Sequence, residues 1–272
     1  MEKQIRQSLN KIWEETQKSI VFSKLTLPET VPAKQEGFIR FVFASDTHEA
    51  PDWENNLPDG DVLIHCGDFT MLGGLQETKD FVSKFEKQPH KIKIVVAGNH
   101  EMTFDTEKFK LKRQVIEERF RYLKKVNDVK VKEVVTTNSN LIYLENSATT
   151  ILGYKIYGSP VQPHFYDWAF NVRRERIGEI WNQIPNDTEI LITHGPPLGF
   201  GDCNEDNEHV GCEDLLNAIR NRVKPKIHAF GHIHHDYGVW KDENTIYVNA
   251  AICDISYNAM RRGIVIDLPV KT

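Results

Sequence analysis

Five short apolar segments, each followed at once by glycine, aspartate or histidine, constrain this chain more than any other feature of its sequence. The segments are residues 38–45, 61–66, 92–97, 188–193 and 226–230. Their length and their β-branched and aromatic residues predict buried strands. Amphipathic stretches predict helices over 74–87, 106–125, 172–183 and 211–222. Strands that alternate with helices indicate a layered α/β fold.

Three further segments are rich in β-forming residues and are not paired with helices. Residues 141–158 predict a strand, a turn and a pair of strands, and residues 237–249 and 262–268 add strands near the C-terminus. This mixture favours an α/β fold in which a two-sheet β-sandwich is flanked by helices.

The N-terminal 37 residues differ from the rest. Apolar residues recur at three- and four-residue spacing over 1–20, which predicts an amphipathic helix. This stripe consists of Ile5, Leu9, Ile12, Trp13 and Ile20. We expect the helix to pack on its own chain rather than on a partner. Two prolines in 27–37 predict a connector, so we divide the chain into a helix and connector, 1–37, and one domain, 38–272.

Composition excludes several classes of protein. The chain is 40% hydrophobic and 27% charged, which is ordinary for a globular protein. Its net charge of -5 argues against a nucleic-acid polymer as partner, because such surfaces are usually basic. We find no secretory signal and no apolar stretch of membrane-spanning length, so we expect a cytoplasmic protein without a membrane partner. The four cysteines form no C-x-x-C pair, which indicates free thiols and argues against a structural zinc site.

The residues that follow the five predicted strands carry the chemistry. They are Asp46-Thr47-His48, Gly67-Asp68, Gly98-Asn99-His100-Glu101, His194-Gly195-Pro196-Pro197 and Gly231-His232-Ile233-His234. Ligands of α/β sheets bind outside the carboxyl ends of the strands, so we expect these side chains to meet at one sheet edge. Carboxylate, amide and imidazole donors without a thiolate favour manganese, iron or zinc in an open catalytic site.

Spacing within these segments suggests how the side chains are presented. Asp46 and His48 are two residues apart, as are His232 and His234. On an extended chain such residues project to the same side, so each pair could hold one ion. Glycines beside the polar residues permit sharp exits from the strands and close approach of the backbone. These glycines are Gly67, Gly98 and Gly231.

Taken in order, D-x-H, G-D, G-N-H-E, H-G and G-H-x-H resemble the motifs of the calcineurin-like metallophosphoesterase superfamily. More narrowly, GDVLIHCGDFT, AGNHEMTFD, IYGSPVQPHFYDWAFN, LITHGPPLGF and FGHIHHDYG resemble the MPPED-type metallophosphodiesterases. The resemblance covers roughly residues 39–268. It implies the metallophosphoesterase αββα fold and two divalent metal ions, manganese first, with iron or zinc as alternatives.

The resemblance also implies a role for each residue that matches the motifs. One ion would be bound by Asp46, His48, Asp68 and His234. The second ion would be bound by Asp68, Asn99, His194 and His232, so that Asp68 bridges the two. His100 would be the catalytic residue, placed beside the substrate rather than on a metal. His235 either reaches toward substrate or faces water, and we expect water.

The function that follows is hydrolysis of small phosphodiesters, such as cyclic nucleotides, by a water activated between the two ions. His100 would stabilise the developing charge or protonate the leaving alkoxide. A phosphomonoesterase, such as a nucleotidase or protein phosphatase on the same fold, is one alternative. A non-catalytic interaction scaffold is another, but scaffolds typically lose ligands, and all seven positions and His100 are present. The expected partner is a small phosphate ester, with nucleotides among the candidates, and no protein partner is indicated.

Two loops are candidates for the walls of a substrate pocket. Residues 158–171 are rich in aromatics and prolines, which suits a loop that could stack on a base. Taken singly, however, Phe165, Trp168 and Phe170 are each expected to anchor the loop or the core. Residues 195–212 follow a candidate ligand and are expected to rim the pocket. Their acidic run argues against a long polyanionic substrate. The remaining histidines, His65, His90, His164, His209 and His228, are assigned no role.

Overall fold

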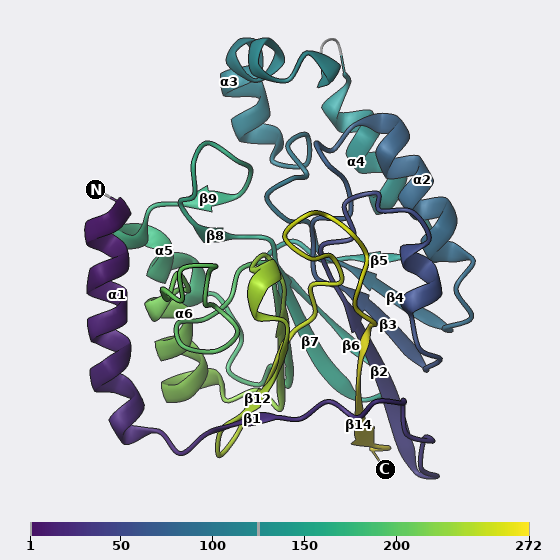
Figure 1. The fold of residues 1–272 in the computed structure, drawn as a ribbon. Helices are drawn as coiled ribbons and strands as arrows, with labels where there is room; N and C mark the ends of the chain where they lie inside the picture. The colour runs from purple at the N-terminus through teal and green to yellow at the C-terminus, as the bar shows by residue number, and fades with distance from the viewer. Residues whose placement is uncertain (1, 124–125, 272) are drawn as a thin grey trace.

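The computed structural model describes residues 2–123 and 126–271, whose strands form two large sheets packed face to face (Figure 1). The first sheet has five strands in the order β14-β2-β3-β4-β5. Its strands are β2 (Phe38–Ala44), β3 (Val62–His65), β4 (Ile92–Val95), β5 (Ile142–Tyr143) and β14 (Ile264–Pro269). Strands β2 to β5 are parallel, and β14 pairs antiparallel with β2.

The second sheet has seven strands in the order β1-β12-β13-β11-β10-β7-β6. Its strands are β1 (Ser23–Leu25), β6 (Ser147–Ile151), β7 (Tyr154–Ser159), β10 (Ile190–Thr193), β11 (Ile227–Phe230), β12 (Gly238–Lys241) and β13 (Ile246–Asn249). The central strands are parallel, and antiparallel strands close both edges. A separate short pair joins β8 (Gln162–Pro163) to β9 (Asn171–Val172).

Side chains on the central strands alternate between two cores, because successive residues of a strand point to opposite faces. On β2, Phe41 and Phe43 lie between the sheets, whereas Val42 faces outward. On β10, Ile192 lies between the sheets and Leu191 faces outward. The inner core therefore contains residues of both sheets, which confirms the predicted sandwich. Burial on both faces explains the continuous apolar runs in the sequence.

Helices cover both outer faces of the sandwich, which completes the αββα layering (Figure 1). The five-stranded sheet is covered by α2 (Leu75–Glu86) and α4 (Asp128–Thr136), and α3 (Thr106–Arg119) joins the same apolar cluster beyond the ends of the strands. The seven-stranded sheet is covered by α1 (Glu2–Thr16), α5 (Arg174–Trp181) and α6 (Glu213–Ala218). A π-helical turn, Ile219–Val223, extends α6, and short 3-10 turns occur at Gln17–Ser19, Trp53–Asn56, Arg121–Leu123 and His234–Asp236.

The structure confirms the five predicted strands and the three strands of 141–158, and it adjusts the helices. The helix predicted over 106–125 ends at Arg119, and its last two positions lie outside the described residues. The sequence did not predict α4, β1 or the β8–β9 pair. Over residues 2–123 and 126–271, no helix has both the length and the apolar character required to span a bilayer.

Candidate metal centre

The predicted ligands gather at one end of the sandwich, where strands of both sheets terminate. Asp46, Asp68 and Asn99 follow β2, β3 and β4 of the five-stranded sheet. His194 and His232 follow β10 and β11 of the seven-stranded sheet. The five segments therefore meet at the seam between two sheets, and the expectation of a single sheet edge is wrong.

The backbone turns sharply at four of the predicted ligands. The φ angle is 54° at Asp46, 43° at His48, 55° at Asp68 and 68° at His232. Side chains other than glycine rarely adopt these left-handed values, which cost about 1–3 kcal/mol each and cluster at functional sites. The sequence predicted that the pair Asp46 and His48 and the pair His232 and His234 leave their strands in extended form. This prediction is therefore wrong. The turn at Asp46 is held by its N–H, which donates to Gly67 O at 2.9 Å.

The three motif glycines lie where a side chain would collide with the site. Gly67 has a φ of +106°, and a Cβ at this position would lie 2.6 Å from His194 Nδ1. A Cβ at Gly98 would meet the Asp68 carboxylate, and one at Gly231 would meet that of Asp46. Close approach of the backbone is thus confirmed at all three, whereas only Gly67 requires the left-handed conformation.

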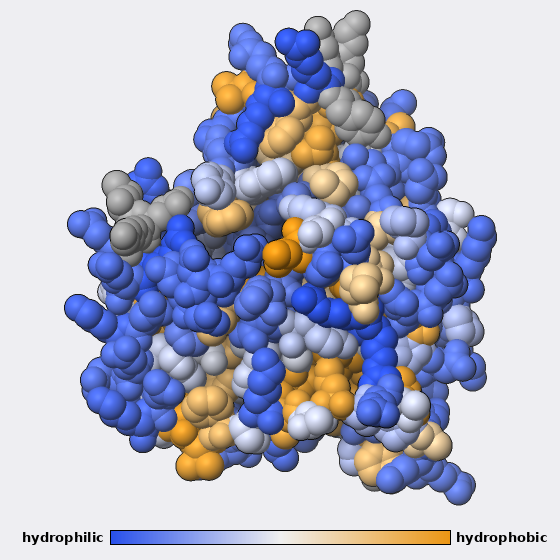
Figure 2. Space-filling view, in the orientation of Figure 1, coloured by the Kyte–Doolittle hydropathy of each residue, from blue (hydrophilic) through white to orange (hydrophobic). Residues whose placement is uncertain are grey.

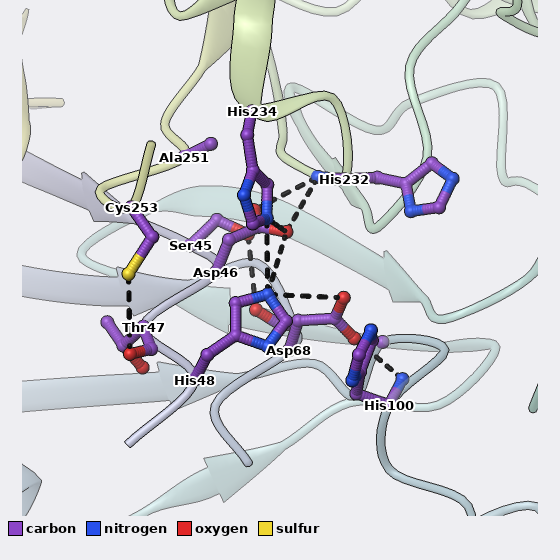
Figure 3. A network of polar contacts seen from close by, with 12 residues as sticks. Ser45, Asp46, Thr47, His48, Asp68, His100, His232, His234, Ala251 and Cys253 are labelled. Atoms are coloured by element: carbon purple, nitrogen blue, oxygen red, sulfur yellow. Dashed lines mark hydrogen bonds and ion pairs between the residues drawn. The ribbon is translucent and has the colours of Figure 1, made fainter. Parts of the chain in front are cut away.

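Asp46, His48 and His234 form the first candidate cation cluster (Figure 3). His234 Nε2 lies 3.4 Å from Asp46 Oδ1 and 3.2 Å from His48 Nε2. His48 Nε2 lies 3.9 Å from the same Asp46 oxygen. One oxygen and two nitrogens thus converge, which is a donor set suited to a divalent transition metal.

Asp68, His194 and His232 form the second candidate cluster. His194 Nε2 lies 3.2 Å from Asp68 Oδ2 and 3.0 Å from Asn99 Oδ1. His232 and His234 therefore belong to different clusters, although their spacing suggested that they could share one ion. The turn at His232 separates the two rings.

Asp68 lies between the two clusters. Its Oδ2 atom is 3.8 Å from His48 Nε2 and 3.2 Å from His194 Nε2. Its Oδ1 atom accepts a hydrogen bond from His100 N at 2.8 Å. One carboxylate oxygen thus faces donors of both clusters, which is the position that a bridging ligand requires.

Backbone carbonyls orient three of the imidazole rings. The Nδ1 atoms of His194, His234 and His100 lie 3.0, 2.8 and 2.8 Å from the carbonyl oxygens of Cys66, Asp254 and Met71. A carbonyl can only accept, so each Nδ1 donates, and the neutral ring keeps its lone pair on Nε2. Such carbonyl partners typically fix the tautomer of histidines that ligate metals.

Asp46 and Asp68 are buried charges that need compensation. Their side chains are 0% and 3% exposed, and within the described part of the chain their ion partners are all histidines. Burial alone would raise the pKa of Asp46, but His234 lowers it through a hydrogen bond and its charge. Burial likewise opposes charge on His194, yet Asp68 raises the pKa of that ring to about 9. These carboxylates stabilise nearby positive charge, so the residues present fit a cationic group.

The imidazoles of His48 and His232 favour the neutral form, whereas Asp46 raises the pKa of His234 against the effect of burial. Burial lowers the pKa of His48 to about 3 and that of His232 to about 3. A neutral ring is the form that binds a metal. The Nε2 atoms of His48 and His234 lie 3.2 Å apart. A divalent cation held by both rings would give these two nitrogen lone pairs a partner.

His100 lies beside both clusters and is 8% exposed. Its ring stacks on Trp168 with centroids 4.3 Å apart, and it makes a T-shaped contact with the ring of His48 at 4.6 Å between centroids. His100 also forms a group with His48 and Asp68 whose ligand atoms lie within 4.8 Å of one another. The ring is therefore within reach of a cation as well as of a substrate.

Glu101 supports the site, a role that was not predicted from the sequence. Its buried carboxylate accepts hydrogen bonds from the backbone N–H groups of Asp68, Thr70 and Gly98, at 2.9, 2.9 and 2.6 Å. Burial and the charge of Asp68 raise the pKa of Glu101 to about 8, against the effect of these donors. The residue holds the turn that carries Asp68. Its presence in the G-N-H-E motif was the available signal.

The histidines without an assigned role lie outside the two clusters. Buried His65 and His228 contact the hydroxyls of Thr47 and Thr193, while His90 and His209 contact Pro58 O and the Asp202 carboxylate. His164 and His235 are exposed and lie at the rim of a pocket. The exposure of His235 agrees with the expectation that it faces water.

A pocket of about 380 Å³ lies above the predicted ligands. Both predicted loops contribute to it, with Phe165 from 158–171 and Asn204 and Val210 from 195–212. Phe170, by contrast, is buried in the core. Helix α1 also lines the pocket, which the sequence did not indicate. The face of the molecule shown in Figure 2 is mostly hydrophilic, with a few hydrophobic residues exposed near its centre.

Comparisons with known proteins identify the family and the fold. The family described as calcineurin-like phosphoesterase matches residues 39–236. Metallophosphoesterase domain-containing protein 1 of Homo sapiens is 47% identical over 248 residues, which cover 89% of this chain and 74% of the relative. The protein of the same name from Mus musculus matches to the same extent. A solved crystal structure, 15% identical, covers 86% of this chain and 100% of its own with a TM-score of 0.56, which shows a shared fold. The chain therefore belongs to the calcineurin-like phosphoesterase family of metal-dependent phosphoric ester hydrolases.

Proposed function

We propose that this chain is a dinuclear-metal phosphodiesterase that hydrolyses small phosphodiesters such as cyclic nucleotides. The observation that carries the proposal is the pair of adjacent donor clusters, with one Asp68 oxygen facing both, beneath a pocket of about 380 Å³. Pockets of this size accommodate ligands as large as a nucleotide.

Each cluster would hold one divalent ion, and manganese suits donors that are oxygen or neutral imidazole nitrogen. The first ion would be held by Asp46, His48, Asp68 and His234. The second would be held by Asp68, Asn99, His194 and His232. Two such ions, when bound, would activate water and neutralise the phosphoryl oxygens during in-line displacement.

His100 would act on the leaving group. Its Nδ1–H donates to Met71 O, so in the protonated ring Nε2 carries the proton that would pass to the departing alkoxide. Trp168 stacks on one face of the ring and restrains its orientation. A positioned general acid contributes roughly 10²–10⁴-fold to rate.

The pocket favours a diester over a monoester because its walls beyond the metal ligands are largely apolar. Ile5, Phe165, Ile255 and Tyr257 line it, which leaves room for a second organic arm on phosphorus. The proposed partner is therefore a small phosphate ester, with nucleotides included. A nucleic-acid polymer is not proposed, since Glu205 stands on the pocket lining and would repel a polyanion.

Metal analysis combined with a substrate panel tests the proposal. Purified protein should bind two equivalents of manganese and hydrolyse bis(4-nitrophenyl) phosphate faster than 4-nitrophenyl phosphate. The opposite preference would indicate the phosphomonoesterase alternative. Binding of metal without turnover of either ester would indicate the non-catalytic scaffold. His235→Ala provides a control for metal content, because this exposed histidine belongs to neither cluster.

A further inference from the structure

Helix α1 lies outside residues 39–236, which match the family, yet it forms part of the pocket above the metal ligands. Ile5, Arg6 and Leu9 line the same cavity as Asp68 and His100. A side chain at residue 5 thus shares a cavity with the proposed catalytic residue, although nearly one hundred positions separate them in the sequence.

Aromatic packing fixes α1 in this position. Trp13 is 5% exposed and contacts the rings of Phe200 and His209, with centroids 5.5 and 5.6 Å apart. Gly199 has a φ of +88°, and a Cβ there would overlap the indole of Trp13. Leu9 is buried in the same apolar cluster. Leu9 and Trp13 therefore anchor one face of the helix in a buried apolar cluster.

Polar contacts join α1 to the loop that rims the pocket. The Asn10 side-chain oxygen accepts a hydrogen bond from His209 N at 2.8 Å, and Arg6 Nη1 lies 3.0 Å from Glu208 Oε2. Within the loop, the buried Asp202 carboxylate accepts from His209 Nδ1 at 2.7 Å and from Gly211 N at 2.9 Å. Helix α1 and the loop 195–212 therefore form one continuous wall of the pocket.

The chemistry of this wall indicates what it contacts. Glu208 offsets the charge of Arg6, so the contribution of α1 to the cavity is mainly the apolar surface of Ile5 and Leu9. Phe165 and Val210 extend this surface. An apolar surface lies against an organic group rather than against a phosphoryl group, which belongs at the metal ligands.

We propose that α1 is a specificity element, and that Ile5 selects phosphodiesters whose organic arm is large and partly apolar, such as a nucleoside. This inference rests on the proposed function for the hydrolysis of the ester. Binding of the organic arm by α1 does not depend on that function. Loss of one apolar contact in such a pocket changes discrimination by roughly 10–200-fold.

Two esters with the same leaving group test the inference. The 4-nitrophenyl esters of thymidine 5′-phosphate and of methyl phosphate differ only in the retained arm. Ile5→Ala should raise the ratio of their KM values, thymidine over methyl, roughly tenfold. Ile12→Ala is the matched control, because it removes the same atoms from the same helix at a position outside the pocket. It should leave the ratio unchanged.

An unchanged ratio in Ile5→Ala, or an equal change in Ile12→Ala, would overturn the inference. If the wild-type protein hydrolyses neither ester, the proposed function fails, and equilibrium binding decides the inference separately. Thymidine 5′-phosphate, titrated calorimetrically with manganese present, should then bind Ile5→Ala roughly tenfold more weakly than wild type and Ile12→Ala. Equal affinities would refute a role for α1.

Discussion

Replacement of His100 separates two roles that its position allows. The ring lies among the donors His48 and Asp68, yet it also lies beside the pocket. If His100 is a general acid, His100→Ala should retain both metal ions and lose roughly 10²–10⁴-fold in kcat. That loss corresponds to about 2.7–5.5 kcal/mol of transition-state stabilisation. If His100 is instead a ligand, the same variant should lose metal.

Leaving-group chemistry sharpens this prediction. Nitrophenolate departs without a proton, whereas an alkoxide needs one, so the loss in His100→Ala should be greatest for an alkyl leaving group. The fixed ring favours a large effect, because Met71 O and Trp168 already hold it in one orientation. The assay is steady-state turnover of both ester types together with metal content by mass spectrometry. A fall in metal stoichiometry, or an equal loss for both leaving groups, would refute the role as an acid.

Three further predictions concern metal content and stability. Asp68→Ala should reduce bound metal from two ions to one or none, measured by elemental analysis, because one carboxylate faces both clusters; two retained ions would exclude bridging. Trp13→Ala should lower the free energy of unfolding by about 3–5 kcal/mol in urea denaturation, whereas Lys11→Ala, on the exposed side of α1, should change it by less than about 0.5 kcal/mol. Burial opposes charge on His209, but Asp202 raises its pKa to about 10. The pair should therefore stabilise the fold fully below pH ~6.5 and progressively less as pH rises through about 10; His209→Gln should flatten this dependence in urea midpoints measured across that range.

The sequence predicted the parts of the fold that rest on local pattern. The run FIRFVFA is buried on both faces, and such a run is recognisable because a central strand between two layers needs apolar residues throughout. Asp46 and Asp68 could be identified as site residues because each follows a run of this kind directly. All seven predicted ligands and His100 lie together, although which of them binds metal stays a prediction.

Features that depend on tertiary contacts could not be predicted. Helix α4 contains four valines, which favour strands, and it is helical because Val131 and Val135 pack on the five-stranded sheet and Asn127 caps its first turn. No local sequence pattern distinguishes the strands of one sheet from those of the other. The sequence therefore could not predict that the ligands come from strands of two different sheets. The contact of Arg6 with Glu208 spans 202 positions, which places α1 at the pocket without any local signal.

The seam has a consequence for the integrity of the molecule. Each donor cluster draws on both sheets, with Asp46 and His234 from different sheets in one, and Asp68 and His194 in the other. A cation in either cluster would be bound by ligands from both sheets. Its binding energy would therefore oppose separation of the two sheets. At a free concentration one hundred times its dissociation constant, such an ion adds about 2.7 kcal/mol to the stability of the fold. The protein would thus be most resistant to unfolding in its metal-bound form, which is also the form proposed to be catalytically active.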